Sequence, residues 1–205
     1  MCFSATASFA AAAVTGAIGI VTLRRARSAA EKPLAAMPLL FAVQQAAEGG
    51  LWLALAQPDA GIWPWALTQV FLAFALVIWP VYVPAAVFMI EPDTRRRNIM
   101  FAQGLLGVAT ASFFLVQLLT LRNEGYISGH HILYRTDVDA PLTAGLVYLS
   151  STVLAMLVSS HRMIVILGAV IFLGAVASWL FMEEVFVSVW CFFAAAPATA
   201  RGRRQ

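Results

Sequence analysis

The chain has 205 residues, of which 61% are hydrophobic and only 11% are charged. A soluble domain has about 45–50% apolar and about 25% charged residues, so the composition excludes a water-soluble globule, and it equally excludes a disordered chain. The net charge of +3 comes from short basic clusters between long apolar runs. No compact basic surface is available to follow a phosphate backbone, and no nucleic acid is expected as a partner.

Seven long apolar runs follow one another along the chain. A transmembrane helix needs about 20 apolar residues, within a range of about 17–25, and six runs reach that length. The third is long enough to tilt, and Pro64, Pro80 and Pro84 are placed to kink it. The seventh is short and ends at Pro197. The sequence therefore predicts an all-α fold, an integral membrane bundle of seven transmembrane helices in one domain (1–205), with spans over about 4–23, 33–56, 62–90, 99–121, 140–160, 163–182 and 185–200.

Basic residues gather in alternate connections between these runs. Only Arg122 and Arg135 lie on one side of the predicted membrane, and all other Lys and Arg residues lie on the opposite side. Because cytoplasmic loops carry the excess of Lys and Arg, we expect the N-terminus outside and the C-terminus in the cytoplasm, in the inner (plasma) membrane of a bacterium. The residues that set this orientation are Arg24, Arg25, Arg27, Lys32, Arg95, Arg96, Arg97, Arg162, Arg201, Arg203 and Arg204.

Glu48 is the one acidic residue inside a predicted span. A carboxylate at that depth is costly unless it is protonated or paired, so it should face the bundle interior or a wet cavity. Gln44 and Trp52 lie four residues to either side on the same helix face, with Gln45 beside it. Together with Tyr134 of the longest outer connection, these residues form the predicted ligand site, with Glu48 as candidate acid/base. The alternative is a protonated, structural Glu48 that hydrogen-bonds to Gln45 or to a neighbouring helix.

Two histidines and two cysteines form a candidate metal site. His130 and His131 lie in the longest connection, residues 122–139. Their imidazole nitrogens suit copper or zinc. Cys191 lies in the predicted seventh span at a depth close to that of Glu48, and Cys2 lies at the outer mouth of the first span. These four residues are the predicted copper or zinc ligands. The alternative is that both cysteines only pack and both histidines are solvated.

Four stretches of the sequence resemble a family of small bacterial membrane proteins of unknown function. They are Met-Cys-Phe-Ser-Ala-Thr-Ala-Ser-Phe at 1–9, Gln-Gln-Ala-Ala-Glu-Gly at 44–49, the pair His130-His131 with Tyr134, and Val-Ser-Val-Trp-Cys-Phe-Phe-Ala-Ala at 187–195. The resemblance implies a polytopic membrane protein and brings no established activity with it. It points to Cys2, Glu48, His130, His131 and Cys191 as motif positions.

Three functions remain open from the sequence. The first is a binding protein whose outward-facing polar site takes a soft metal ion or a small periplasmic ligand. The second is a small permease or an accessory subunit of a larger membrane complex. The third is a membrane enzyme that acts on a lipid or quinone, with Glu48 as acid/base. The lipid bilayer is a partner in each case, and self-association as a homo-oligomer also stays open. Polar residues are scarce in the inner halves of the spans, which favours a one-sided site.

The orientation can be tested with single-cysteine variants in a background without Cys2 and Cys191. Cysteines at the outer positions 59, 129 and 183 should react with an impermeant thiol reagent in whole cells. Cysteines at the inner positions 29, 94 and 203 should react only after lysis. Labelling of Thr94→Cys from outside would overturn the orientation, because that connection holds three of the arginines on which it rests.

Overall fold

The computed structural model describes residues 4–129, 131–137 and 142–181. Six helical segments follow the first six apolar runs closely. They are α1 (Ala5–Arg25), α2 (Lys32–Leu55), α3–η1–α4 (Trp63–Leu72, Ala73–Ile78 and Trp79–Ile90), α5 (Thr94–Thr120), α6–η2–α7 (Leu142–Leu149, Ser150–Leu154 and Ala155–Leu157) and α8 (Arg162–Phe181). The prediction of a mostly helical chain is therefore confirmed.

Within the described residues, three helical segments are long and apolar enough to cross a membrane, by length and composition. They are α1, the continuous segment Trp63–Ile90, and α5. The segments Thr143–Leu157 and Arg162–Val176 are apolar but shorter. The predicted seventh run, 185–200, lies outside the described residues, and seven crossings stay a prediction.

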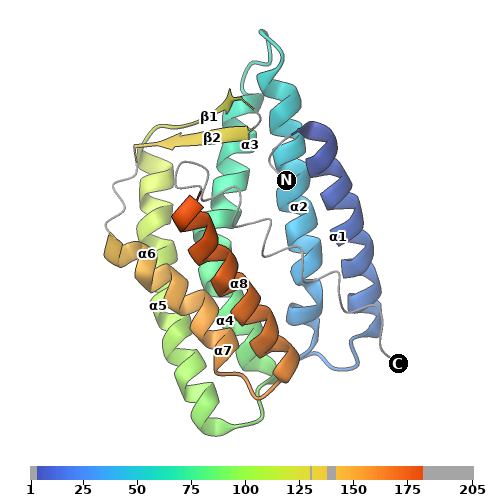
Figure 1. Ribbon diagram of the computed structural model, residues 1–205, viewed down its shortest axis with the longest axis vertical. Coiled ribbons are helices and arrows are strands. Elements are labelled where there is room, and N and C mark those ends of the chain that lie inside the picture. Colours follow the sequence, from blue (N-terminus) through green and yellow to red (C-terminus); the bar gives the residue numbers. More distant parts are fainter. Residues whose placement is uncertain (1–3, 130, 138–141, 182–205) are drawn as a thin grey trace.

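The helices form a bundle with two different ends (Figure 1). The helix pairs α1 and α2, α4 and α5, and α7 and α8 pack side by side, and α2 also contacts α3. At one end lie the start of α1, the connection between α2 and α3, and the two strands, and we call this the hairpin end. At the opposite end lie the connections α1–α2, α4–α5 and α7–α8. Arg27 lies in the first of them, and Arg95 and Arg162 lie in the first turns of α5 and α8, so we call this the arginine end.

The longest connection is a β-hairpin, which corrects the all-α prediction. Strand β1 (Asn123–Ser128) pairs antiparallel with β2 (His131–Thr136), with Gly125 opposite Tyr134 and Ile127 opposite Ile132. The physical reason lies in the sequence, because Tyr126, Ile127, Ile132 and Tyr134 have the β-branched or aromatic side chains that favour strands. Gly129 follows β1 with a φ of +59°, a left-handed conformation that glycine adopts without steric cost.

Two π-helical segments interrupt the long helices. Pro80 is the second residue after η1, and because proline has no N–H, the carbonyl four residues earlier, within η1, loses its α-helical partner. The hydroxyl of Tyr148, just before η2, donates a hydrogen bond to the carbonyl oxygen of Ala75 in η1 at 2.7 Å. The two irregular segments are therefore linked across the bundle, and the third run contains a widened turn just before Pro80.

Glycine allows the backbones of α4 and α5 to meet. A Cβ added at Gly107 would lie only 1.9 Å from the carbonyl oxygen of Pro80. No side chain larger than hydrogen fits there, so the position of α5 on α4 depends on this residue. Gly104, one turn earlier on the same helix, has no atom within 4 Å of an added Cβ.

This contrast yields a matched pair of variants. Gly107→Ala should lower the free energy of unfolding by about 1–3 kcal/mol, because the two backbones must separate. Gly104→Ala should leave stability unchanged or raise it by up to about 1 kcal/mol, because alanine favours the helix over glycine. Denaturant unfolding of the purified protein in detergent measures both values. Equal effects of the two substitutions would contradict the close contact.

Candidate functional site

Glu48 is completely buried, at 0% exposure, near the hairpin end of α2. Its Oε2 accepts a hydrogen bond from the hydroxyl of Ser8 on α1 at 3.2 Å. Its Oε1 accepts one from the hydroxyl of Tyr134 on β2 at 3.5 Å. Three elements far apart in the sequence therefore meet at one carboxylate.

The hairpin is fixed over this carboxylate by two contacts with α3. The ring of Tyr134 stacks parallel on Phe71, with ring centroids 4.5 Å apart. Gly125 is the cross-strand partner of Tyr134, and a Cβ at this position would lie 2.8 Å from Oγ1 of Thr68. Because directly opposed residues of an antiparallel pair face the same side of the sheet, Thr68 lies against the same face of the hairpin as Tyr134.

Other buried polar side chains share the helix face of Glu48 on α2 or lie under the hairpin on α3. Gln45 is 2% exposed and Thr68 is 0% exposed. Oε1 of Gln45, Nε1 of Trp52 and Oγ1 of Thr68 are buried without a hydrogen-bond partner in the described part of the chain. We call Ser8, Gln45, Glu48, Trp52, Thr68 and Tyr134 the Glu48 cluster. Buried polar atoms in proteins are nearly always satisfied, so a cluster with three unpaired atoms is unusual.

Gln44 takes a different role from the other predicted ligand residues. Its Oε1 accepts a hydrogen bond from Nε1 of Trp79 at 2.9 Å, and Trp79 in turn stacks on Phe41 at 4.1 Å between ring centroids. Gln44 therefore links α2 to α4, whereas Gln45, Glu48 and Trp52 lie at i, i+3 and i+7 along α2 and so share one helix face.

The unpaired polar atoms are confined to the hairpin half of the molecule. Besides the three in the Glu48 cluster, three more buried side-chain atoms in the described residues have no partner, namely Gln69 Oε1, Gln117 Nε2 and Asn123 Oδ1. All six belong to the last half of α2, the middle of α3, the last turn of α5 or the start of β1. In the described part of the chain, buried polar side-chain atoms without a partner therefore lie at the hairpin end alone.

The copper or zinc site stays a prediction. Cys2, His130 and Cys191 lie outside the described residues, while His131 is half-buried on β2 opposite Ser128. Within residues 4–129, 131–137 and 142–181, no group of three or more His, Cys, Asp or Glu side chains could hold a metal ion.

Sequence reasoning missed Ser8 and Thr68. Both are small hydroxyl residues in apolar helices, and their burial follows from tertiary contacts alone. Ser8 lies in the stretch 1–9 that resembles the family. This resemblance was the one feature of the sequence that pointed to Ser8.

Sequence reasoning also missed Glu91, a second buried carboxylate, at the arginine end. Glu91 directly follows α4 and is 3% exposed. Oε2 accepts hydrogen bonds from the backbone N–H of Ser160 at 2.8 Å and the hydroxyl of Ser159 at 3.2 Å. Oε1 accepts hydrogen bonds from the hydroxyl of Ser160 and from the N–H of Asp93, the latter at 3.3 Å. The carboxylate therefore ties the end of α4 to the connection between α7 and α8.

Two opposing effects set the pKa of Glu91. Burial raises the pKa, but the hydrogen bonds from Ser160, from the backbone of Asp93 and from Ser159 outweigh it and hold the pKa below its ordinary value of 4.5. These hydrogen bonds favour the ionised form. Glu91 is an anion in the folded protein, with a structural role at the arginine end.

The fold and the site define a mostly helical chain with three helices apolar enough for a membrane and a polar interior at one end. The chain belongs to DUF6629, a family of unknown function, whose family model matches residues 1–201. No curated protein and no solved structure is significantly similar to the chain.

Glu91→Gln tests the anchoring of the arginine end. The substitution should lower the free energy of unfolding at neutral pH by about 1–3 kcal/mol, because an ionised acceptor is lost from a buried network. Since the folded-state pKa is depressed, the advantage of wild type is fully present above pH 4.5 and shrinks as the pH falls below that value. Unfolding measured at pH 7 and at acidic pH checks both points. A stability difference that grows on acidification would contradict the ionised network.

Proposed function

We propose that this chain is a bacterial plasma-membrane protein of seven transmembrane helices that binds a small cationic ligand from outside, at the Glu48 cluster. In this arrangement the N-terminus and the hairpin end face outward, and the arginine end faces the cytoplasm. The distribution of basic residues supports the orientation, and the three long apolar helices support the membrane location.

The observation that carries the proposal is the completely buried carboxylate of Glu48, hydrogen-bonded to α1 and to the hairpin. An ionisable residue within a membrane-spanning segment is costly and is typical of a functional site. A ligand with a positive charge offsets that cost, because it pairs with the carboxylate.

The surroundings of Glu48 indicate what else the ligand carries. Gln45 Oε1 is an unpaired acceptor, which suits an ammonium group, whereas Trp52 Nε1 and the Thr68 hydroxyl are unpaired groups that can donate. The ring of Phe71 stacks on Tyr134 of the cluster, and aromatic faces attract cations. A small molecule with an ammonium group and a hydroxyl matches these partners. A zinc or copper ion also carries a positive charge, so a metal ion is the alternative ligand of this site.

The hairpin controls access in this proposal. Glu48 is covered by Tyr134 and β1 packs on α2 and α3, so the ligand enters when the hairpin moves away from α3. A lid of this kind sequesters a site from water after closing.

Glu48→Gln tests the proposal with ethanolamine as the probe. Ethanolamine should raise the Tm of the purified wild-type protein, and ethylene glycol, which lacks the charge, should not. Glu48→Gln should fold and lose the Tm increase, because the amide keeps shape and hydrogen bonding but cannot ionise. Zn(II) and Cu(I) are measured in parallel, and a Tm increase confined to a metal ion assigns the site to metal.

Asp137→Asn is the matched control, because Asp137 is an exposed carboxylate at the same end of the bundle. It should respond to ethanolamine as wild type does. An equal response of Glu48→Gln and wild type would overturn the proposal. A Glu48→Leu variant as stable and as competent as wild type would exclude both a functional and a structural role of the carboxylate.

A further inference from the structure

The β-hairpin turns one face toward the helices. Residues two apart in a strand, and residues opposite each other in a pair, lie on the same face, so this face holds Asn123, Gly125, Ile132 and Tyr134. Asn123 and Ile132 are 1% and 0% exposed. The other face carries the exposed Glu124 and Arg135, which are cross-strand partners of opposite charge. The hairpin is therefore an amphipathic cover over the Glu48 cluster.

The base of the hairpin is fastened to the end of α5. Nδ2 of Asn123, the first residue of β1, donates to the carbonyl oxygens of Leu118 and Leu121 at 3.1 and 3.0 Å. Nε2 of Gln69 on α3 donates to the same oxygen of Leu118 at 3.3 Å. At the tip, a Cβ added to Gly129 would meet no atom of the described residues within 4 Å. The base is therefore fixed, whereas the tip has room to move.

Between base and tip, the strand β1 lies directly on α3. A Cβ at Gly125 would be 2.8 Å from Oγ1 of Thr68 and 3.2 Å from Cδ2 of Leu51. Both of these side chains are completely buried, and the side chain of Thr68 is β-branched, which restricts its rotamers. The hairpin can therefore lie this close to α3 only with glycine at position 125.

The closed hairpin combines opposing contributions to its stability. The hydrogen bond from Tyr134 to Glu48 and the stacking of Tyr134 on Phe71 favour the closed position. Oγ1 of Thr68 is buried without a hydrogen-bond partner in the described part of the chain. A buried polar group without a partner raises the free energy of the state that buries it. The unpaired hydroxyl therefore favours an open position, in which water reaches it.

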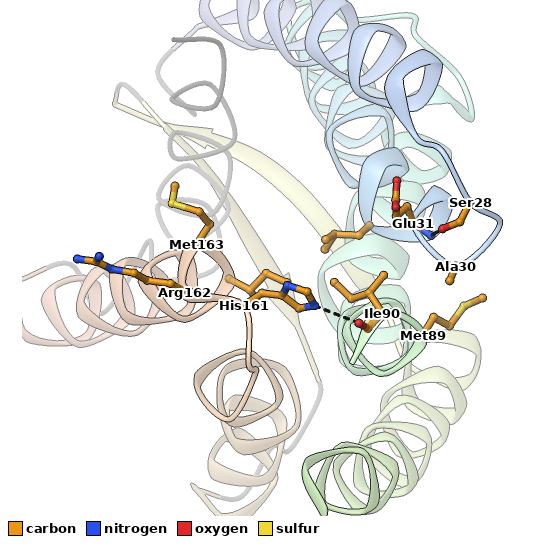
Figure 2. Close-up of a pocket in the computed structure, with 10 residues that line it drawn as sticks. Ser28, Ala30, Glu31, Met89, Ile90, His161, Arg162 and Met163 are labelled. Carbon is orange, nitrogen blue, oxygen red and sulfur yellow. Dashed lines mark hydrogen bonds between the residues drawn. The ribbon is translucent and has the colours of Figure 1, made fainter. Parts of the chain in front are cut away.

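The opposite end of the bundle is held differently. Figure 2 shows the cavity at the arginine end, where Nε2 of His161 lies 3.0 Å from the carbonyl oxygen of Ile90. The guanidinium of Arg96 donates to the carbonyl oxygen of Val158 at 2.9 Å. Together with the Glu91 network, these hydrogen bonds fix the connection between α7 and α8 to the end of α4. This connection is a fixed reference for any movement of the hairpin.

We propose that the hairpin is a lid that pivots at Asn123, and that Gly125 and Thr68 form the contact that closes it. In the closed position the backbone of Gly125 rests on Thr68, and Tyr134 reaches Glu48. A ligand beneath the lid provides partners for the unpaired atoms there, so binding favours the closed position. The inference rests on the proposed function for the identity of the site, whereas the movement itself needs no ligand.

Gly125→Ala tests the closing contact by hydrogen–deuterium exchange of the purified protein without ligand. Alanine is ordinarily more favourable than glycine in a strand, which alone would slow the exchange of the amides in β1 and β2. Because the added Cβ meets Thr68, exchange should instead become about tenfold faster, through more frequent local opening. The amides between α7 and α8 should exchange as in wild type.

Thr68→Ala in the same chain removes the obstacle and should restore the wild-type exchange rate of the hairpin. This double variant keeps the test decisive if Gly125→Ala alone does not fold, because the double variant should then fold.

A single cysteine beneath the lid tests access to the site. Thr68→Cys, in a background without Cys2 and Cys191, should react slowly with a hydrophilic thiol reagent. The reaction should become about tenfold faster when Gly125→Ala is added, because the lid then opens more often. Gly104→Ala is the matched control, since its added Cβ meets no atom of the described residues within 4 Å. It should change neither the labelling rate nor the exchange of the hairpin.

Three results would each overturn the lid: equal effects of Gly125→Ala and Gly104→Ala, slower hairpin exchange in Gly125→Ala, or no rescue by Thr68→Ala. If Gly125→Ala opens the hairpin as expected while ethanolamine leaves the Tm unchanged, the lid is supported and the proposed ligand is overturned.

Discussion

The buried carboxylate of Glu48 must be hydrogen-bonded, and its two hydrogen-bond donors join α1 and the hairpin to α2. Ser8 and Tyr134 come from positions 40 residues before and 86 residues after Glu48. Both hydroxyls reach it only if α1 lies against α2 and the hairpin lies over α3. An unsatisfied buried carboxylate costs several kcal/mol, more than most single packing contacts contribute. The hairpin end therefore has one arrangement that satisfies Glu48, and the stacking of Tyr134 on Phe71 follows from it.

The helical segments could be predicted from the sequence because their limits are set by local chemistry. Apolar runs end where charges begin, and α5 begins where the side chain of Asp93 accepts a hydrogen bond from the N–H of Arg96. The predicted start of that helix, residue 99, is late because the arginines at 95–97 were assigned to the connection. The hairpin was missed because two six-residue strands within a polar segment give only a weak alternation of apolar and polar residues.

The candidate site could be predicted only in part, for a similar reason. An acidic residue in an apolar run is visible in the sequence, so Glu48 and its neighbours on α2 were found. Ser8 and Thr68 were not, because nothing local separates a buried serine or threonine from an exposed one that bonds to its own helix, as Thr120 does with the carbonyl oxygen of Val116. Glu91 was missed because it lies at the boundary of a run, where an exposed carboxylate is ordinary. Its burial depends on Ser159 and Ser160, about 70 residues away in the chain.

The widened turn at Ala73–Ile78 fixes how the two halves of the long third helix face the bundle. A π-helical turn holds more residues than an α-helical turn, so the register of α4 relative to α3 includes an offset. If the same residues formed a regular α-helix, α4 would rotate by about 100° against α3, since an α-helix has 3.6 residues per turn. Trp79 would then turn away from Gln44, and Pro80 would turn away from Gly107. The widened turn thus holds one extra residue while Trp79 and Pro80 keep their partners. A single-codon deletion within Ala73–Ile78 is therefore tolerable, because a regular α-helix one residue shorter presents α4 at nearly the same angle.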